Sequence, residues 1–240
     1  MIFFLFLLLI LSCASMKIAG EGQFHDDYLS KSNTTAINGI FVVLVLLCHF
    51  TQYAQFETGM IDQSFVYFKS HLGQLVVTTF LFFSGYGIIC SISKKGMPYI
   101  KSIPKKRFLS VLIHFDIAVA LFMILNLCLG RSFPLKTNLL ALTGWESIGN
   151  SNWYILAILC LYLIVFFSFI ICRGNKYIGT ILTTVLTVGY VYLLIRAKKP
   201  AYFYNTLICY PFGMIYGLLK DKIDKIVMKN DFIYTLFVAV

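Results

Sequence analysis

His49 is the residue of this chain whose type and position are best suited to acid–base chemistry. It lies near the end of a long apolar run that follows Asn38 and Gly39. A neutral imidazole can take the proton of a hydroxyl group, and such general-base catalysis contributes ~10²- to 10⁴-fold to a rate. An imidazole in an apolar helix can also be a hydrogen-bonded packing group. Position 49 is therefore predicted to be either a catalytic base or a packing residue.

A second candidate segment is the sequence FLFFSGYG over residues 80–87, in which Ser84, Gly85 and Tyr86 interrupt an apolar run. Small residues let helices approach closely, and a serine hydroxyl can form a hydrogen bond across the contact. The segment is therefore predicted either to pack closely against the helix that carries His49 or to shape a pocket.

Lys105, Lys106 and Arg107 end a stretch over residues 94–107 that holds six basic residues and no acidic one. Cations of this kind usually fix the orientation of membrane helices. They can also bind phosphate groups, and the planar guanidinium of arginine can do so through two parallel hydrogen bonds. The two interpretations are compatible.

Asp116 and Trp153 can each have a functional role or a structural one. Asp116 lies inside an apolar run, where a charged carboxylate costs at least ~2.5 to 3.5 kcal/mol, so it must be paired, protonated or hydrated. Trp153 opens another apolar run, where tryptophan is typical of an interfacial anchor and can alternatively serve as a substrate platform.

The cysteines and histidines predict no metal site. The seven cysteines lie inside or at the ends of apolar runs with no C-x-x-C pair, and the four histidines have no ligand spacing.

The composition identifies the kind of structure that must position these residues. The chain is 59% hydrophobic and only 12% charged, with a mean hydropathy of +0.83, which excludes a water-soluble globular protein. Apolar segments in lipid must satisfy their backbone groups internally, so an all-α, polytopic membrane helix bundle is predicted. The net charge of +10 comes from cations between apolar runs, and nucleic acid is discounted as a partner.

Hydropathy predicts about six complete transmembrane helices. They are expected near residues 36–53, 72–92, 108–129, 153–172, 177–195 and 203–219. An apolar N-terminal segment over residues 1–16 and a truncated last helix from Phe232 accompany them. The N-terminal apolar segment and polar lead then occupy residues 1–35, and the membrane domain occupies residues 36–240.

The basic stretch 94–107 is predicted to be cytoplasmic, and alternation then places the loops near 54–71 and 130–152 outside. The cations of the 196–199 segment fall outside by the same count. Either two spans are misread, or these cations face an anionic substrate.

The order and spacing of these segments resemble the acyltransferase family 3 membrane proteins, which include bacterial enzymes that O-acetylate surface polysaccharides. The first helix of that family carries a polar residue and Gly before an apolar stretch ending in His, as Asn38, Gly39 and His49 do here. Residues 80–86 are similar to its F-F-x-x-S-G segment, and residues 105–107 to the basic entry of its third helix.

Residues 152–156 and 210–214, with the sequences NWYIL and YPFGM, extend the resemblance, which covers residues 33 to about 230. Two positions depart from the family. Asn38 stands where the family usually has Arg, and Ser110 takes the second place of its R-x-x-R pair. The resemblance also implies more membrane helices than this chain completes, so a C-terminally truncated member is expected.

The resemblance implies an enzyme of the bacterial plasma membrane that moves an acyl group, typically acetyl from acetyl-CoA, to a hydroxyl of a cell-surface glycan or lipid-linked sugar. Acyl-CoA is then a co-substrate, and no bound cofactor is implied. His49 is the implied catalytic residue. The implied donor-binding residues are Arg107, Lys105 and Lys106, and the implied pocket and packing residues are Asn38, Ser84, Gly85, Tyr86 and Trp153.

Two alternatives remain open. The chain can be a non-enzymatic transporter, flippase or scaffold in which His49 and Asp116 relay ions or pack, or it can be an inactive acyltransferase fragment. Internal repeats and matching broken helices are typical of transporters, and the sequence shows neither. This favours the enzyme.

Overall fold

A computed structural model describes residues 2–14, 16, 18–50 and 59–239, and no β-strand occurs in these ranges. The predicted all-α fold is confirmed. Five of the described helical stretches are long and apolar enough to cross a membrane. They are Lys31–Phe50, Gln63–Lys95, Met97–Cys128, Trp153–Ile171 and Lys176–Arg196.

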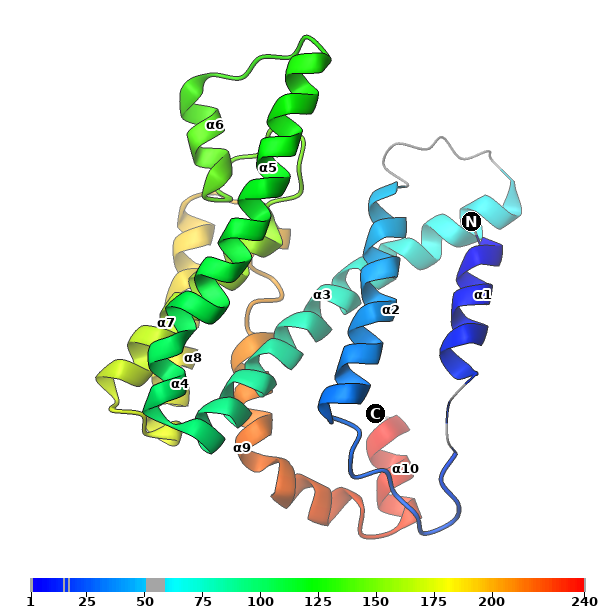
Figure 1. The fold of residues 1–240 in the computed structure, drawn as a ribbon. Coiled ribbons are helices and arrows are strands. Elements are labelled where there is room, and N and C mark those ends of the chain that lie inside the picture. The colour runs from blue at the N-terminus through cyan, green and yellow to red at the C-terminus, as the bar shows by residue number, and fades with distance from the viewer. Residues whose placement is uncertain (1, 15, 17, 51–58, 240) are drawn as a thin grey trace. The chain divides into compact units, whose positions relative to one another are not determined.

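The helices follow one another along the chain as shown in Figure 1. Their bounds are α1 Ile2–Cys13, α2 Lys31–Phe50, α3 Met60–Lys95, α4 Met97–Ile103, α5 Ser110–Cys128, α6 Leu135–Leu142, α7 Trp153–Ile171, α8 Lys176–Arg196, α9 Cys209–Val227 and α10 Asp231–Ala239. A π-helical segment, Pro104–Leu109, joins α4 to α5, and a 3₁₀ turn, Ala201–Phe203, precedes α9.

The chain divides into two compact units. The first unit contains Met1–Phe80 and Leu219–Val240, and the second unit contains Leu81–Leu218. Helices α3 and α9 pass from one unit to the other along the chain.

The basic stretch expected as a connection is helical instead. Gly96 has a left-handed φ of 60°, which ends α3, and α4 begins at Met97 with Pro98 in its first turn, where a missing N–H costs no hydrogen bond. Pro104 lies further along the same helical stretch, and the backbone there widens into the π-helical segment. The third span therefore begins at Met97, about three helical turns before residue 108, where the sequence pattern predicts its start.

The apolar run at 203–219 also divides differently from its prediction. It contains the end of a 3₁₀ turn, a short turn region and then the first part of α9, which begins at Cys209 and continues to Val227. Lys220, Asp221 and Lys222 give α9 a charged second half. This helix is not among the five that meet the length and composition requirements for a span.

In the first unit, polar contacts tie the segment before α2 to α9. The Tyr28 hydroxyl donates to the Asp224 carboxylate at 2.7 Å. Lys220 forms an ion pair with the same carboxylate and donates to the Asp26 carbonyl. An edge-to-face contact between Phe41 and Phe80, with ring centroids 6.0 Å apart, joins α2 to α3.

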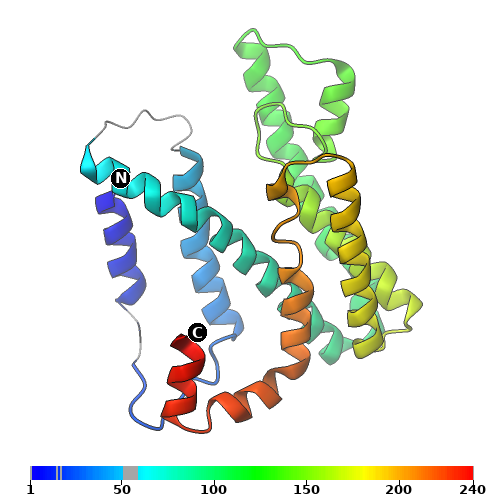
Figure 2. The same ribbon diagram turned by 180° about the vertical axis from the view of Figure 1, so that it is seen from behind.

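The core of the second unit is built around α7. Leu161, Val165 and Phe169 are fully buried on α7, and α8 returns beside α7 (Figure 1, and from behind in Figure 2). Gly179 of α8 makes room for the Phe169 ring, because a Cβ at position 179 would come within 2.8 Å of that ring. Helix α7 is therefore the central helix against which the others pack.

Candidate functional site

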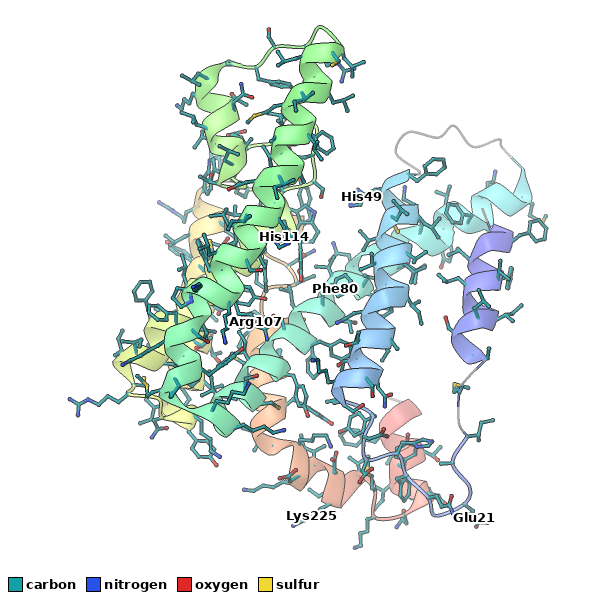
Figure 3. All side chains as sticks on the ribbon, viewed as in Figure 1. Glu21, His49, Phe80, Arg107, His114 and Lys225 are labelled. Atoms are coloured by element: carbon teal, nitrogen blue, oxygen red, sulfur yellow. The ribbon has the colours of Figure 1, made fainter. Side chains whose placement is uncertain are left out.

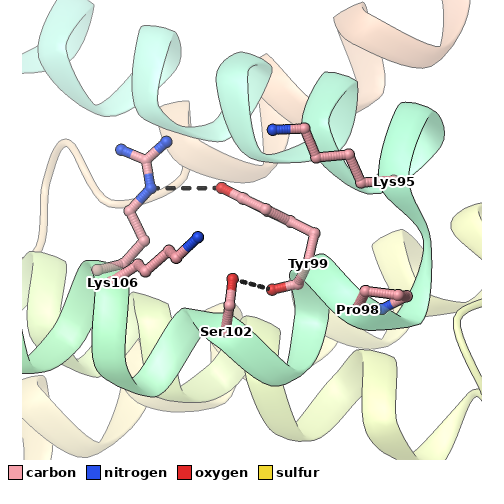
Figure 4. Close-up of a pocket in the computed structure, with 6 residues that line it drawn as sticks. Lys95, Pro98, Tyr99, Ser102 and Lys106 are labelled. Atoms are coloured by element: carbon pink, nitrogen blue, oxygen red, sulfur yellow. Dashed lines mark hydrogen bonds between the residues drawn. The ribbon is translucent and has the colours of Figure 1, made fainter.

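A basic cleft of about 380 Å³ opens beside α4 and the π-helical segment. Figure 4 shows its lining residues. They are Lys95, Pro98, Tyr99, Ser102, Lys106 and Arg107. The lining thus carries three cations and no carboxylate, which suits an anionic group such as a phosphate.

The helical state of this stretch explains the composition of the cleft. Tyr99, Ser102 and Lys106 follow one another at spacings of three and four residues in the helical stretch that begins at Met97, so they share one face, and Lys95 joins them from the end of α3. Sequence reasoning missed Lys95, Tyr99 and Ser102 because it treated the stretch as a loop. For Tyr99 and Ser102, the helical spacing from Lys106 was the signal that could have identified them.

The predicted donor-binding residues are divided by the structure. Lys106 and Arg107 line the cleft, whereas Lys105 is exposed and is not part of the lining. Successive helical residues point about 100° apart, so three adjacent cations cannot share one face.

Arg107 connects the cleft to a cluster of tyrosines. Its Nε donates a hydrogen bond to the Tyr99 hydroxyl at 3.3 Å, and its charge also interacts with the phenol groups of Tyr162 and Tyr210. Tyr162 and Tyr210 are buried, with exposed fractions of 6% and 0%. Arg107 therefore lines the open cleft and also interacts with buried phenol groups in the interior of the second unit.

Ser84 takes part in the same interior cluster. Its hydroxyl lies 3.3 Å from the Tyr162 hydroxyl, at hydrogen-bonding distance. The serine of the predicted FLFFSGYG segment thus lies on α3 facing α7.

Gly85 and Tyr86 contact α9. A Cβ at position 85 would lie 2.0 Å from the Tyr210 carbonyl oxygen, and a Cβ at Gly213 would lie 2.1 Å from the Phe82 carbonyl oxygen. Each helix therefore presents a glycine to the backbone of the other. The Tyr86 ring lies 3.2 Å from the Cβ position of Gly217. The close approach that Gly85 permits is to α9.

Trp153 lies among aromatic residues at the other end of α7. Its ring makes edge-to-face contacts with Tyr154 and Tyr202, with centroid distances of 6.2 and 5.9 Å. Nine residues separate Trp153 from Tyr162, which corresponds to about 13 Å along a helix. Trp153 therefore belongs to a different place in the second unit from the basic cleft.

Lys199 stacks on the other tryptophan. Its ammonium lies 4.0 Å from the Trp145 ring centroid and 5.0 Å from the Phe203 centroid, and it donates to the Trp145 carbonyl. Lys198, just before it, has a left-handed φ of 54° in the turn that ends α8. Lys199, one of the cations of the 196–199 segment that the predicted orientation places outside, thus packs against aromatic rings.

His49 and Asn38 both lie on α2, in the first unit, and His49 is labelled in Figure 3. Eleven residues separate them, which corresponds to three helical turns and about 16 Å, so they share one face of α2. Both side chains are half-buried. The Asn38 Oδ1 atom is buried and accepts no hydrogen bond from the residues that the structure describes.

Asp116 and His114 do not pair with each other. His114 is exposed and donates from Nδ1 to the Ser110 carbonyl at 2.6 Å, and it is labelled on α5 in Figure 3. The Asp116 Oδ1 atom is buried without a hydrogen-bond donor among the described residues. Within the described part of the chain, no group of three or more His, Cys, Asp and Glu side chains is placed to hold a metal ion.

The second unit therefore places a cluster of cations next to buried hydroxyl groups. The cleft supplies cations at one end of the helices, and Arg107 links them to phenol and serine hydroxyls in the interior.

Comparison with known proteins assigns the chain to a family. A model of the acyltransferase 3 family, described as an acyltransferase domain, matches residues 35–239. Comparisons with curated proteins and with solved structures returned no match. The matched region includes the helix of His49, the FLFFSGYG segment and the basic cleft. The chain is therefore a membrane protein that belongs to the acyltransferase 3 family.

Proposed function

We propose that this membrane acyltransferase takes an acetyl group from acetyl-CoA and transfers it to a hydroxyl of a cell-surface glycan or lipid-linked sugar. The observation that supports a CoA thioester as donor is the basic cleft, in which Lys95, Lys106 and Arg107 meet without any carboxylate in the lining. The CoA part of this donor is water-soluble and carries several phosphates. A membrane enzyme that uses it therefore needs a cationic site at the end of its helices. The cleft has the charge for that task.

The donor phosphates bind Lys106 and Arg107 in this proposal. A guanidinium can hold a phosphate through two parallel hydrogen bonds, while an ammonium acts as a compact point charge. The family's second cation is replaced by Ser110 in this chain. Lys95 and Lys106 supply alternative positive charge in the cleft.

His49 is the proposed general base. It takes the proton of the acceptor hydroxyl as that oxygen attacks the thioester carbonyl carbon, and the CoA thiolate leaves. Asn38, on the same face of α2, has an amide oxygen that accepts no hydrogen bond from the described residues and can accept one from the acceptor.

The acceptor side of the proposal is supported by the aromatic end of the second unit. Trp145 and Tyr202 are 38% and 45% exposed there, and Trp153 packs beside Tyr202. The C–H faces of sugar rings pack well on aromatic rings, and Lys199 offers further N–H donors because only one is used by the Trp145 carbonyl. A saccharide hydroxyl is therefore the proposed acceptor rather than a lipid or protein group.

Donor binding is tested with purified protein in lipid nanodiscs and radiolabelled acetyl-CoA. Lys106→Ala and Arg107→Ala should each weaken binding about 10-fold or more, because a charge-assisted hydrogen bond contributes ~1.5–3 kcal/mol. Lys101→Ala is the matched control, because Lys101 carries the same charge and is exposed as Lys106 is, but it does not line the cleft. It should change the affinity less than 2-fold.

Two outcomes contradict the donor assignment. One is unmeasurable binding of acetyl-CoA to the unmutated protein. The other is an equal loss of affinity in all three variants, which would show that only net charge matters. Where transfer is measured, Arg107→Ala should raise KM more than it lowers kcat, because the phosphate contact forms before the transition state.

A further inference from the structure

The hydroxyl group of Tyr210 is one of several buried polar groups of the second unit that have no hydrogen-bond partner among the described residues, and it is the one on which the Arg107 charge acts. Tyr210 is fully buried, with an exposed fraction of 0%. Its hydroxyl makes no hydrogen bond to any residue that the structure describes. A buried hydroxyl without a partner costs roughly 1–3 kcal/mol, and such a cost at a fixed position points to a partner that is present during function.

The groups around Tyr210 are rich in hydrogen-bond donors. The charges and dipoles that act on its hydroxyl come from Arg107 and from the phenols of Tyr99, Tyr154 and Tyr162. No carboxylate is among these groups. Arginine can only donate, and a phenol can donate. The surroundings therefore favour an oxygen atom that accepts hydrogen bonds and gains negative charge.

The same residues connect Tyr210 with the basic cleft. Arg107 and Tyr99 line the cleft and also act on the Tyr210 hydroxyl. The hydrogen bond from Arg107 to Tyr99 lies at this boundary. The cleft and the Tyr210 hydroxyl thus share two neighbouring residues, Arg107 and Tyr99.

The backbone of Tyr210 is held firmly in place. Its carbonyl oxygen faces Gly85, where even one methyl group would clash at 2.0 Å. The reciprocal contact of Gly213 with the Phe82 carbonyl, less than one turn further along α9, fixes the same helix again. A donor held by packing before the reaction needs no reorganisation during the reaction, which is the condition for effective electrostatic stabilisation.

We infer that the Tyr210 hydroxyl donates a hydrogen bond to the carbonyl oxygen of the bound acyl thioester and stabilises the oxyanion that forms there. This inference rests on the proposed function. The acceptor oxygen forms a bond to the carbonyl carbon, and the π electron pair moves to the carbonyl oxygen, which Tyr210 stabilises. The intermediate then reforms the carbonyl and breaks the C–S bond. CoA leaves as a thiolate, and the base takes the proton of the acceptor hydroxyl.

The test compares Tyr210→Phe with Tyr190→Phe. Each substitution removes one hydroxyl and keeps the aromatic ring, so packing changes little. Tyr190 is a suitable control because it lies with Cys160 beside the groove between α7 and α8 and is not among the residues that act on Arg107. Tyr210→Phe should lower kcat about 10²- to 10³-fold, as loss of one oxyanion donor does. Acetyl-CoA affinity should change less than 3-fold, and Tyr190→Phe should retain full kcat.

A second measurement needs no turnover. The infrared band of acetyl-CoA labelled with ¹³C at the thioester carbonyl should move to lower frequency on binding to the unmutated protein. In Tyr210→Phe, the band should return toward its position in solution. This readout applies even if the variant is less stable than the parent protein.

The outcomes separate this inference from the proposed function. If acetyl-CoA binds but its carbonyl band does not shift, or Tyr210→Phe transfers acetyl at the parental rate, the role of Tyr210 is wrong and the proposed function stands. If both tyrosine variants lose activity equally, the effect belongs to buried hydroxyls in general and the inference fails. If acetyl-CoA does not bind the unmutated protein, the proposed function fails and the inference fails with it.

Discussion

Replacement of Gly85 by alanine adds a single methyl group at the point where α3 meets the backbone of α9. The new Cβ would lie 2.0 Å from the Tyr210 carbonyl oxygen and 2.9 Å from the carbonyl carbon. Ordinary contacts of a Cβ atom are 3.4–4 Å. The obstacle is backbone and not a flexible side-chain end, so no rotamer change can remove the clash, and the two helices must separate by more than ~1 Å.

The energetic cost follows from that separation. A gap of 0.5–1 Å already forfeits a quarter to a half of the dispersion attraction across a contact, and overpacking typically costs about 1–3 kcal/mol. Alanine gains about 0.5–1 kcal/mol over glycine inside a helix, which partly offsets this cost. Gly87→Ala is the matched control, because it lies two residues further on α3 and a Cβ there has nothing within 4 Å. The two variants should therefore differ by about 2 kcal/mol or more.

Thermal unfolding in detergent or nanodiscs measures this difference. Both tryptophans of the chain, Trp145 and Trp153, lie in the second unit with Gly85, so their fluorescence reports the relevant transition. For a protein of this size, 2 kcal/mol corresponds to about 4–8 °C in Tm. Gly85→Ala should unfold about 4–8 °C below Gly87→Ala. Gly87→Ala itself should unfold at or slightly above the parental temperature.

The Gly213→Ala variant provides an internal check. Its Cβ would lie 2.1 Å from the Phe82 carbonyl oxygen, in the same helix contact. Once Gly85→Ala has separated the helices, the second substitution should cost less, so the double variant should be less destabilised than the sum of the two. Equal melting temperatures for Gly85→Ala and Gly87→Ala would refute the reasoning, because they would show that α3 and α9 do not meet at this glycine.

Three further predictions use other parts of the chain. Lys198→Gly should raise stability by about 0.5–1 kcal/mol in the same melting assay, because Lys198 holds a φ of 54° that glycine adopts without strain; a lower Tm would show that the side chain has a stabilising contact. His49→Ala should lower acetyl transfer at least ~10²-fold without loss of acetyl-CoA binding, and full activity would return His49 to a packing role. Introduced cysteines should be labelled in intact cells at Glu146→Cys and protected at Lys101→Cys, in a background without the native cysteines; the reverse pattern would overturn the predicted orientation.

The fold class and the helical stretches could be obtained from the sequence because both follow from local chemistry. A run of about 20 apolar residues has little alternative to a helix in lipid. The observed bounds Trp153–Ile171 and Lys176–Arg196 agree with the predicted spans to within one residue. The order of polar residues along the chain was likewise enough to identify the family.

The basic cleft was predicted only in part, because its shape depends on a backbone state that local composition obscures. A stretch with lysines and two prolines is typical of a loop, yet Pro98 stands in a first helical turn and Pro104 is absorbed by a π-helical segment. Once the stretch is helical, Lys106 and Arg107 join Lys95 and Tyr99, and Lys105 turns away from them.

The partners of each helix were decided by tertiary structure alone. In a soluble protein, an apolar stripe tells which face of a helix is buried, but a membrane helix is apolar on all sides, so its sequence does not say which face meets which neighbour. The sequence determined that Gly85 would permit a close approach and that Tyr210 would lie in an apolar run. Only the fold decided that these two residues meet, that the Tyr210 hydroxyl is buried beside Arg107, and that Lys199 stacks on Trp145. Such contacts join residues far apart in the chain, and their choice depends on how complete side chains fit together in space.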